Sequence, residues 1–260
     1  MIPSKAKDRQ LGLSLIELMV ALLLSSLLIL GVTQIFIDNK RNYAFQQGQS
    51  GNIENARYAT MLLEQEFYRA GYQVRQENLV TETFPEASHQ DCSFKAGEFI
   101  NYDTEDQRIC LRYEPHLPQI TMCNGETVAG PTDPYSRFTG DPVVVALQVF
   151  NGTLFCNDTP LIENTEDVRF SFGVDGRDGL GETKQYTITP TDGDAIHSVR
   201  YAVLLRSRAQ NLTDSTESPV YRAWHEKWES EPNVAAPDRA LYFALENTVA
   251  IRNKHPDDRK

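Results

Sequence analysis

The chain has 260 residues, of which 40% are hydrophobic, a composition typical of one globular domain with a membrane segment. Its 36 acidic side chains outnumber its 25 basic ones, so the net charge at pH 7 is −11. Binding to a nucleic-acid backbone requires a basic patch that neutralises phosphates, and no such strip is visible in the sequence. We therefore expect no nucleic-acid partner.

The first element in chain order is an apolar stretch from Leu13 to Ile37. Twenty consecutive residues, Leu18–Ile37, carry no charge, which is long enough for a helix that crosses a bilayer. Three basic residues, Lys5, Lys7 and Arg9, precede the stretch and favour a cytoplasmic amino terminus. The bulk of the chain is then expected across the inner membrane, in the periplasm.

One glutamate, Glu17, interrupts the apolar stretch. A carboxylate inside hydrocarbon costs about 2–3 kcal/mol even on insertion scales, so an intramembrane acid is a candidate functional residue. A cleaved secretory signal has a shorter apolar core, followed by a small-residue cleavage site, whereas Asp38-Asn39-Lys40-Arg41 follows here. A plain signal anchor fits the length and charge but gives no reason for Glu17 or for the nearby Gly12.

The helical pattern continues beyond the apolar stretch. No proline occurs between Ile37 and Gly71, and residues at spacings of three and four predict one buried face of an amphipathic helix. The residues of this face are Ile53, Ala56, Thr60, Leu63, Phe67 and Ala70. Gly48 and Gly51 predict a bend or melted turn, since glycine costs about 1 kcal/mol relative to alanine in a helix. Gly71 is the expected helix end.

From about Glu98 the hydrophobic period changes to two, which predicts β-strands. The expected strands are Glu98–Tyr102, Arg108–Tyr113, Val143–Phe150, Thr153–Cys156, Val168–Val174, Val199–Leu205 and Leu241–Ile251. Asn151-Gly152, between two apolar runs, predicts a tight hairpin. Loops are expected at Gly125–Pro142, Asp175–Thr183, Asn211–Pro219 and Glu229–Pro237. A long helix packed on an antiparallel sheet makes the expected fold class α+β.

Four cysteines, Cys92, Cys110, Cys123 and Cys156, all lie beyond the apolar stretch. In an oxidising periplasm they predict disulfides, and their spacing matches no zinc pattern. Four cysteines allow three connectivities. The sequence-local pairing, Cys92 with Cys110 and Cys123 with Cys156, is our expectation.

Motifs for metal or catalytic chemistry are weak. The segment Trp224–Glu229 begins like a His-Glu-x-x-His zinc helix, but Glu229 stands at the second histidine position. Asp175, Asp178 and Glu182 lie in a glycine-rich turn with the oxygen ligands that calcium prefers, although their spacing does not fit an EF-hand loop. No nucleophile elbow or phosphate-binding glycine loop is present in the sequence. We expect no catalytic residue, no cofactor and no metal site beyond this weak calcium candidate.

The segment Gly12-Leu13-Ser14-Leu15-Ile16-Glu17-Leu18 resembles the processing site of type IV prepilins. The whole layout resembles a large minor pilin, most closely the PilW family, with further similarity in Asp167–Asp175, Ser198–Ser207 and Val249–Asn253. The resemblance implies a pilin-like fold in four parts. These are a leader (residues 1–12), a transmembrane and fibre-core helix (13–37), its amphipathic continuation (38–71) and a periplasmic head (72–260).

The resemblance also implies the processing and the partners. A prepilin peptidase would cleave between Gly12 and Leu13 and methylate Leu13, where the major subunits usually carry Phe. Glu17, the fifth residue of the mature chain, would pair with the amino terminus of a neighbouring subunit. By resemblance such a protein is not an enzyme. It would join other minor pilins, the major pilin and the inner-membrane assembly platform, prime fibre assembly and end at the pilus tip.

Two other functions stay open on the sequence. One is a large minor pseudopilin of a type II secretion system, which has the same leader and fold. The other is a periplasmic enzyme or binding module that merely shares the anchor. Glu17 would be dispensable in that last case.

Overall fold

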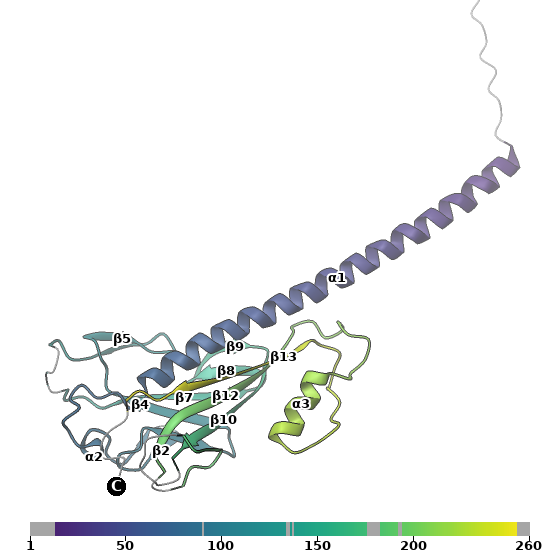
Figure 1. The fold of residues 1–260 in the computed structure, drawn as a ribbon. Coiled ribbons are helices and arrows are strands. Elements are labelled where there is room, and N and C mark those ends of the chain that lie inside the picture. The colour runs from purple at the N-terminus through teal and green to yellow at the C-terminus, as the bar shows by residue number, and fades with distance from the viewer. Residues whose placement is uncertain are drawn as a thin grey trace, which may run out of the picture. The chain divides into compact units, whose positions relative to one another are not determined.

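The computed structural model of the protein describes residues 14–89, 91–133, 136, 138–175, 183–191 and 194–253. It contains two compact units, Met1–Gln47 and Gly48–Lys260, and we call the second unit the head. The longest element, helix α1 (Leu15–Arg69), contributes residues to both units (Figure 1).

The carboxyl-terminal part of α1 forms the main helical layer of the head. Its buried residues recur at helical spacing, as the sequence predicts: Asn52, Ala56, Ala59, Leu62, Leu63, Glu66 and Phe67. One residue of the predicted face, Ile53, is instead 38% exposed. The reason is its position at the margin of the face, where it lines a shallow groove together with Phe243 and Leu245.

Gly48 and Gly51 lie inside α1, and Gly71 lies just after its end. The helix is continuous through Gly48 and Gly51, so the melted turn expected there is wrong. A Cβ atom at Gly48 would lie 2.7 Å from Leu212 Cδ1, and the glycine is therefore explained by close packing. At the end of the helix Gly71 has a φ of +72°, and its N–H donates to the Arg112 carbonyl at 2.9 Å. Gly71 ends the helix as predicted.

Antiparallel strands form two main sheets in the described part of the chain. The first has the order β3-β4-β7-β8-β9, with bounds Ile100–Asp103, Arg108–Tyr113, Val143–Phe150, Thr153–Cys156 and Thr159–Glu163. The second has the order β11-β10-β12-β13, with bounds Gln185–Thr187, Thr165–Val174, Ile196–Arg206 and Tyr242–Ala250. Two short hairpins complete the strands: β1 (Ala87–His89) with β2 (Cys92–Phe94), and β5 (Gln119–Thr121) with β6 (Thr127–Ala129).

All seven predicted strands are present, three of them with the predicted bounds. Asn151 and Gly152 both have positive φ, as the predicted tight hairpin between β7 and β8 requires. The sequence did not predict β1, β2, β5, β6, β9 and β11, nor the helices α2 (Val80–Thr83) and α3 (Pro219–Trp228). The expected loop Gly125–Pro142 contains β6, which is a correction.

One hydrophobic core joins α1 to both sheets. The Phe67 ring of α1 lies 6.0 Å from the rings of Phe170 on β10 and Tyr201 on β12. Tyr102 on β3 lies 5.6 Å from Phe170, which links the first sheet to the second. Figure 1 shows the head part of α1 lying along the strands. The expected α+β class is confirmed.

Candidate functional site

The amino-terminal part of α1 presents a continuous apolar surface. Residues 14–43 are all exposed, and an 18-residue window of the helix has a mean hydropathy of 2.6 with none of it buried. By length and composition, α1 is the one helix in the described part of the chain that could cross a membrane. An apolar surface of this size calls for lipid or partner helices to cover it.

Hydroxyl groups in this segment are satisfied within the helix itself. Ser25 Oγ donates to the Ala21 carbonyl at 2.6 Å, and Thr33 Oγ1 donates to the Ile29 carbonyl at 2.7 Å. Ser26 Oγ donates in the same way to the Leu23 carbonyl at 2.8 Å. Because these hydroxyls keep their hydrogen bonds without water, they are compatible with an apolar environment.

Glu17 is the single charged residue between positions 14 and 37. It lies in the first turn of α1, where the partial positive charge of the helix terminus favours a carboxylate. Its side chain is exposed, like those of its apolar neighbours Ile16 and Leu18. A carboxylate in that position is free to meet a cation supplied by another chain. Gly12 and Leu13, the expected cleavage site, lie outside the described residues.

Two disulfides, Cys92–Cys110 and Cys123–Cys156, pair the four cysteines locally in sequence. The first ties the β1–β2 hairpin to β4, and the second ties the turn of the β5–β6 hairpin to β8. Isolated two-stranded hairpins are marginal in water. The cross-links therefore hold onto the first sheet two elements that could not be stable alone. They also suit an oxidising compartment.

Of the three calcium candidates, Asp175 lies in the described part of the chain. Asp175, at the end of β10, is 2% exposed, and its Oδ2 lies 3.4 Å from His197 Nε2. Asp178 and Glu182 lie outside the described residues. Within the described part of the chain, no group of three or more acidic, histidine or cysteine side chains is placed to hold a metal ion.

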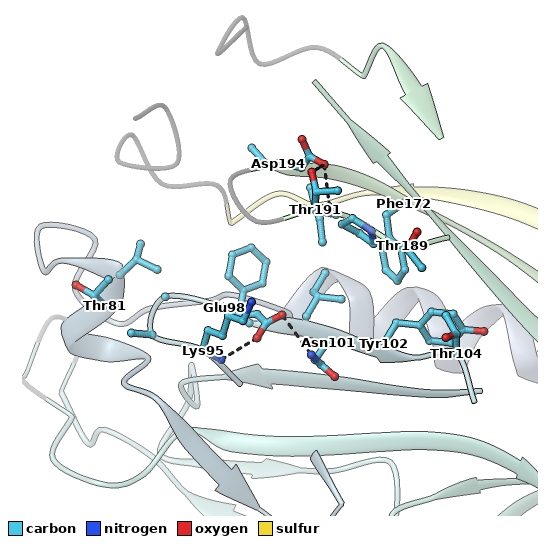
Figure 2. Close-up of a pocket in the computed structure, with 18 of the residues that line it drawn as sticks. Thr81, Lys95, Glu98, Asn101, Tyr102, Thr104, Phe172, Thr189, Thr191 and Asp194 are labelled. Carbon is cyan, nitrogen blue, oxygen red and sulfur yellow. Dashed lines mark hydrogen bonds between the residues drawn. The ribbon is translucent and has the colours of Figure 1, made fainter. Parts of the chain in front are cut away.

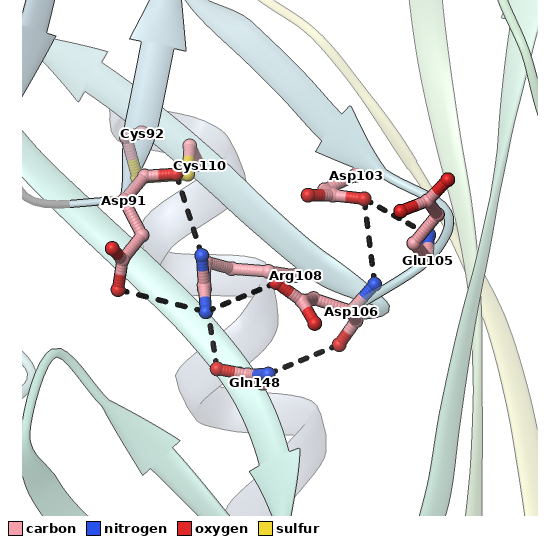
Figure 3. Close-up of polar contacts among 8 residues, drawn as sticks. All are labelled: Asp91, Cys92, Asp103, Glu105, Asp106, Arg108, Cys110 and Gln148. Atoms are coloured by element: carbon pink, nitrogen blue, oxygen red, sulfur yellow. Dashed lines mark hydrogen bonds and ion pairs between the residues drawn. A yellow bond between two sulfur atoms is a disulfide. The ribbon is translucent and has the colours of Figure 1, made fainter.

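A group of acidic residues surrounds Arg108 beside the Cys92–Cys110 disulfide (Figure 3). Arg108 NH2 lies 3.6 Å from Asp91 Oδ2 and 3.5 Å from Asp106 Oδ2, and its Nε donates to Gln148 Oε1 at 3.1 Å. Asp103 accepts from the backbone N–H of Glu105 at 2.9 Å and so shapes the turn between β3 and β4. These contacts stabilise the β3–β4 hairpin, so the acidic residues have a structural role.

The segment that resembles a zinc helix anchors α3 to the second sheet. Trp224 Nε1 donates to Asp167 Oδ2 at 2.9 Å, and His225 Nδ1 lies 2.5 Å from Glu229 Oε2. Arg169 bridges Asp167 at 2.7 Å and Glu229 at 2.6 Å. His225 pairs with the Glu229 carboxylate just after the end of α3, and the contacts of this segment pack α3 against the second sheet.

One buried cation, Arg112, organises the segment before β3. It is 2% exposed, and its guanidinium donates to the carbonyls of Pro85 at 2.6 Å, Phe84 at 3.1 Å, Lys95 at 2.8 Å and also Glu98. The group lies 4.6 Å from the ring centroid of Phe94, a cation–π distance. Burial lowers the pKa of Arg112 to about 10. The guanidinium thus ties the backbone at Phe84 and Pro85 to the backbone at Lys95 and Glu98.

A cleft of about 710 Å³ opens beside this segment (Figure 2). One wall consists of β3 and the residues before it, including Glu98, Asn101 and Tyr102. The opposite wall holds Phe172 of β10, the residues Thr189, Thr191 and Asp194 before β12, and Ile196 at the start of β12. Its volume is in the range of ligand pockets, roughly 300–1,000 Å³.

Sequence reasoning missed Arg112 and the cleft. An arginine in the otherwise apolar run Ile109–Tyr113 was the available signal for Arg112, since a charged residue in a buried strand needs partners. No local signal announces the cleft, because its walls lie about seventy or more residues apart in the chain, at Asn101 and Phe172 for example.

Two family models match the chain. The model described as Prokaryotic N-terminal methylation motif matches residues 7–33, and PilW, described as Type IV Pilus-assembly protein W, matches residues 136–253. Among solved structures, a type IV-like pilin from Thermus thermophilus is similar at 11% identity with a TM-score of 0.43, over 77% of this chain and 96% of that chain. No curated protein sequence matches the chain significantly.

Proposed function

Since this chain belongs to the PilW family of type IV pilus minor pilins, we propose that it primes pilus assembly from the inner membrane and is incorporated at the pilus tip. The observation that carries the proposal is Glu17, the one charge in an exposed apolar helix of the length of a membrane span. This helix requires lipid before assembly and partner helices afterwards. The family and the described fold are structural, so the proposed role includes no catalysis.

Processing is the first step of the proposed mechanism. Cleavage between Gly12 and Leu13 would remove residues 1–12, including the basic head, and would create a new amine on Leu13. That amine stays positive when it carries one methyl group. The carboxylate of Glu17 on one subunit and the Leu13 amine of its neighbour would then neutralise each other in an apolar fibre core. The uncleaved chain lacks this amine, so cleavage would convert a stored membrane protein into an assembly-competent one.

The strength of such a pair explains its value for assembly. Removing one partner of a buried ion pair costs about 3–5 kcal/mol, because the other charge is left uncompensated. The pairing would therefore fix the register between neighbouring subunits. The proposed partners are the other minor pilins, the major pilin, the prepilin peptidase and the assembly platform.

The proposed topology places the amino terminus in the cytoplasm and the head in the periplasm. The basic residues Lys5, Lys7 and Arg9 support it, since positive residues stay on the cytoplasmic side. The two disulfides of the head support it as well, because disulfides persist in an oxidising periplasm.

Intact mass and amino-terminal sequencing test this function directly. The protein is purified from cells with and without the prepilin peptidase. We expect a mature chain that starts at Leu13 with one added methyl group, and an unprocessed chain in the peptidase mutant. A retained Met1 in peptidase-positive cells, or cleavage beyond Ile37, would contradict the proposal.

A second test separates assembly from anchoring. Glu17→Leu keeps the apolar length of the helix but removes the carboxylate, so we expect normal membrane insertion and at least tenfold less of the protein in sheared fibres. Ser14→Ala, in the same segment, is the matched control and should assemble normally. Equal incorporation of Glu17→Leu would favour an anchored periplasmic module. Association with a secretion apparatus in place of surface fibres would favour the type II secretion pseudopilin.

A further inference from the structure

The cleft in the head lies along the free edge of a β-strand. In the first sheet β3 is the terminal strand, and β4 is its one neighbour within the described part of the chain. Residues 97–102 line the cleft, and Figure 2 shows Asn101 and Tyr102 on one side with Thr189 and Thr191 on the other. The cleft therefore follows the side of β3 that faces away from β4.

The register shows which backbone groups face the cleft. The Arg112 N–H donates to the Phe99 carbonyl at 3.0 Å, which makes Phe99 and Arg112 a hydrogen-bonded pair of the antiparallel ladder. Such pairs alternate with non-hydrogen-bonded ones. Ile100 and Tyr102, opposite Leu111 and Ile109, are therefore in non-hydrogen-bonded positions. Their N–H and C=O groups point away from β4, toward the cleft.

A polypeptide backbone is the ligand that complements this edge. Along a strand, outward-facing N–H and C=O groups recur every second residue, about 6.8 Å apart. A second extended backbone offers donors and acceptors at the same spacing, which is how peptides add to exposed sheet edges. A sugar or a nucleotide has no such repeat.

The side chains of the cleft indicate the composition of the peptide. Tyr102 and Ile196, which are partly exposed, offer apolar contacts to side chains of an added strand. Two carboxylates, Glu98 and Asp194, stand on opposite walls, against one amine, Lys95. Asp194 is held in place because its Oδ2 accepts from Thr191 N at 2.9 Å and from Thr191 Oγ1 at 2.7 Å. The Glu98 carboxylate on the β3 wall favours a basic residue between the apolar ones.

We propose that this cleft binds an extended segment of a partner protein by strand addition to β3, with apolar residues alternating with basic ones. Arg112 is a positioning residue for this site, since it fixes the carbonyls of Lys95 and Glu98 in the wall. The proposal does not depend on the role of α1 in assembly, because every residue that it uses lies in the head.

The test uses the full chain in detergent and a pool of synthetic eight-residue peptides in which lysine alternates with a variable apolar residue. Binding is measured by fluorescence anisotropy at physiological ionic strength. We expect members of the pool to bind, and Thr189→Trp, which fills the cleft, to weaken that binding at least tenfold. Thr127→Trp, on the separate β5–β6 hairpin, is the matched control and should bind like the unmodified protein.

Backbone methylation of the best peptide distinguishes strand addition from attraction by charge alone. Only alternate N–H groups of an added strand face β3, so N-methylation of one alternate set should abolish binding and methylation of the other set should be tolerated. Both methylated peptides carry the same charge. Equal effects of the two sets would overturn the proposal.

Two other results would also overturn it. One is a pool with no binding up to about 1 mM, the weak end of specific affinity. The other is self-association of the full chain that Thr189→Trp abolishes while the peptides stay unbound, because the occupant would then be a second copy of this chain. Equal unfolding midpoints of the two tryptophan variants verify that the head is intact.

Discussion

Charged groups are treated in opposite ways in the two units of this protein. In the head, Arg112 is 2% exposed and has four carbonyl partners, and Glu66 is 1% exposed and has Arg69 at 3.1 Å. In the amino-terminal unit Glu17 stands exposed in an apolar surface, with no cation between residues 14 and 37. The head pairs Arg112 and Glu66 with groups of its own, whereas residues 14–37 offer Glu17 no cation.

This contrast predicts that Arg112→Met unfolds the head more readily than any other single substitution considered below. The change removes four hydrogen bonds donated by a charged group, each of which contributes about 1.5–3 kcal/mol. The carbonyls of Phe84 and Lys95 keep a backbone donor, Gly97 N and Glu98 N, whereas those of Pro85 and Glu98 lose the guanidinium. We expect the free energy of unfolding to fall by about 4 kcal/mol or more. Urea denaturation of the full chain in detergent measures it. Arg222→Met, exposed on α3, is the control and should change the midpoint little. A loss of less than about 1 kcal/mol in the free energy of unfolding for Arg112→Met would mean that the head does not depend on its buried charge.

The disulfides predict the next largest effect. Their loops span 18 residues for Cys92–Cys110 and 33 residues for Cys123–Cys156. On loop length alone, each bond stabilises by about 3–4 kcal/mol, and the longer loop gains slightly more. We expect Cys123→Ser with Cys156→Ser to lower the unfolding midpoint more than the pair Cys92→Ser with Cys110→Ser.

Limited proteolysis of these two double variants refines the disulfide prediction. Each should expose its own hairpin, β5–β6 in one case and β1–β2 in the other, while the rest of the head stays protected. Cleavage that is the same in both variants would mean that the hairpins are not held separately by their own cross-links.

Whether the sequence predicts a helix or strand of this protein depends on how many residues its hydrophobic pattern spans. Strands such as β10 and β12 alternate over many residues, and α1 repeats its spacing over several turns, so periodicity identified them. The hairpins β1–β2 and β5–β6 have strands of three residues, too short for any period. Arg112 escaped notice because β4 is buried on both faces, where alternation carries no information.

The candidate sites divide along the same line. Glu17 could be predicted because its environment is made by its sequence neighbours. The edge of β3 could not, since the cleft exists only after β10 and the residues before β12 have folded against it. A site made by neighbours in the sequence can be predicted from it, whereas a site made by segments far apart in the sequence cannot.

A pH series tests whether the head tolerates its buried carboxyl at a cost. Burial raises the pKa of Glu66 above its ordinary 4.5, although Arg69 opposes the shift. The folded state then binds this proton more tightly than the unfolded state, so the contribution is fully present below pH 4.5 and is lost as pH rises through the raised pKa. We expect Glu66→Gln to gain stability relative to the unmodified protein as pH increases from about 4.5 to 8.

The matched substitution for this series is Glu54→Gln, exposed on the same helix. Its difference from the unmodified protein should stay constant across the series. Urea midpoints at each pH give both differences, and a flat difference for Glu66→Gln would mean that its burial costs nothing.

The smallest effect is expected in the membrane segment. Ser25 and Thr33 donate to carbonyls of their own helix, and these carbonyls also accept a backbone N–H of the helix. Ser25→Ala and Thr33→Val therefore remove a hydroxyl and leave no backbone carbonyl unpaired. We expect membrane insertion, measured by carbonate extraction, to stay unchanged. Ser25→Asp should reduce it, because a carboxylate near the middle of the span costs about 2.5–3.5 kcal/mol. If Ser25→Asp inserted as well as Ser25→Ala, the segment would not lie in hydrocarbon. Glu17 would then not be a carboxylate in an apolar environment, and the argument for its role in assembly would fail.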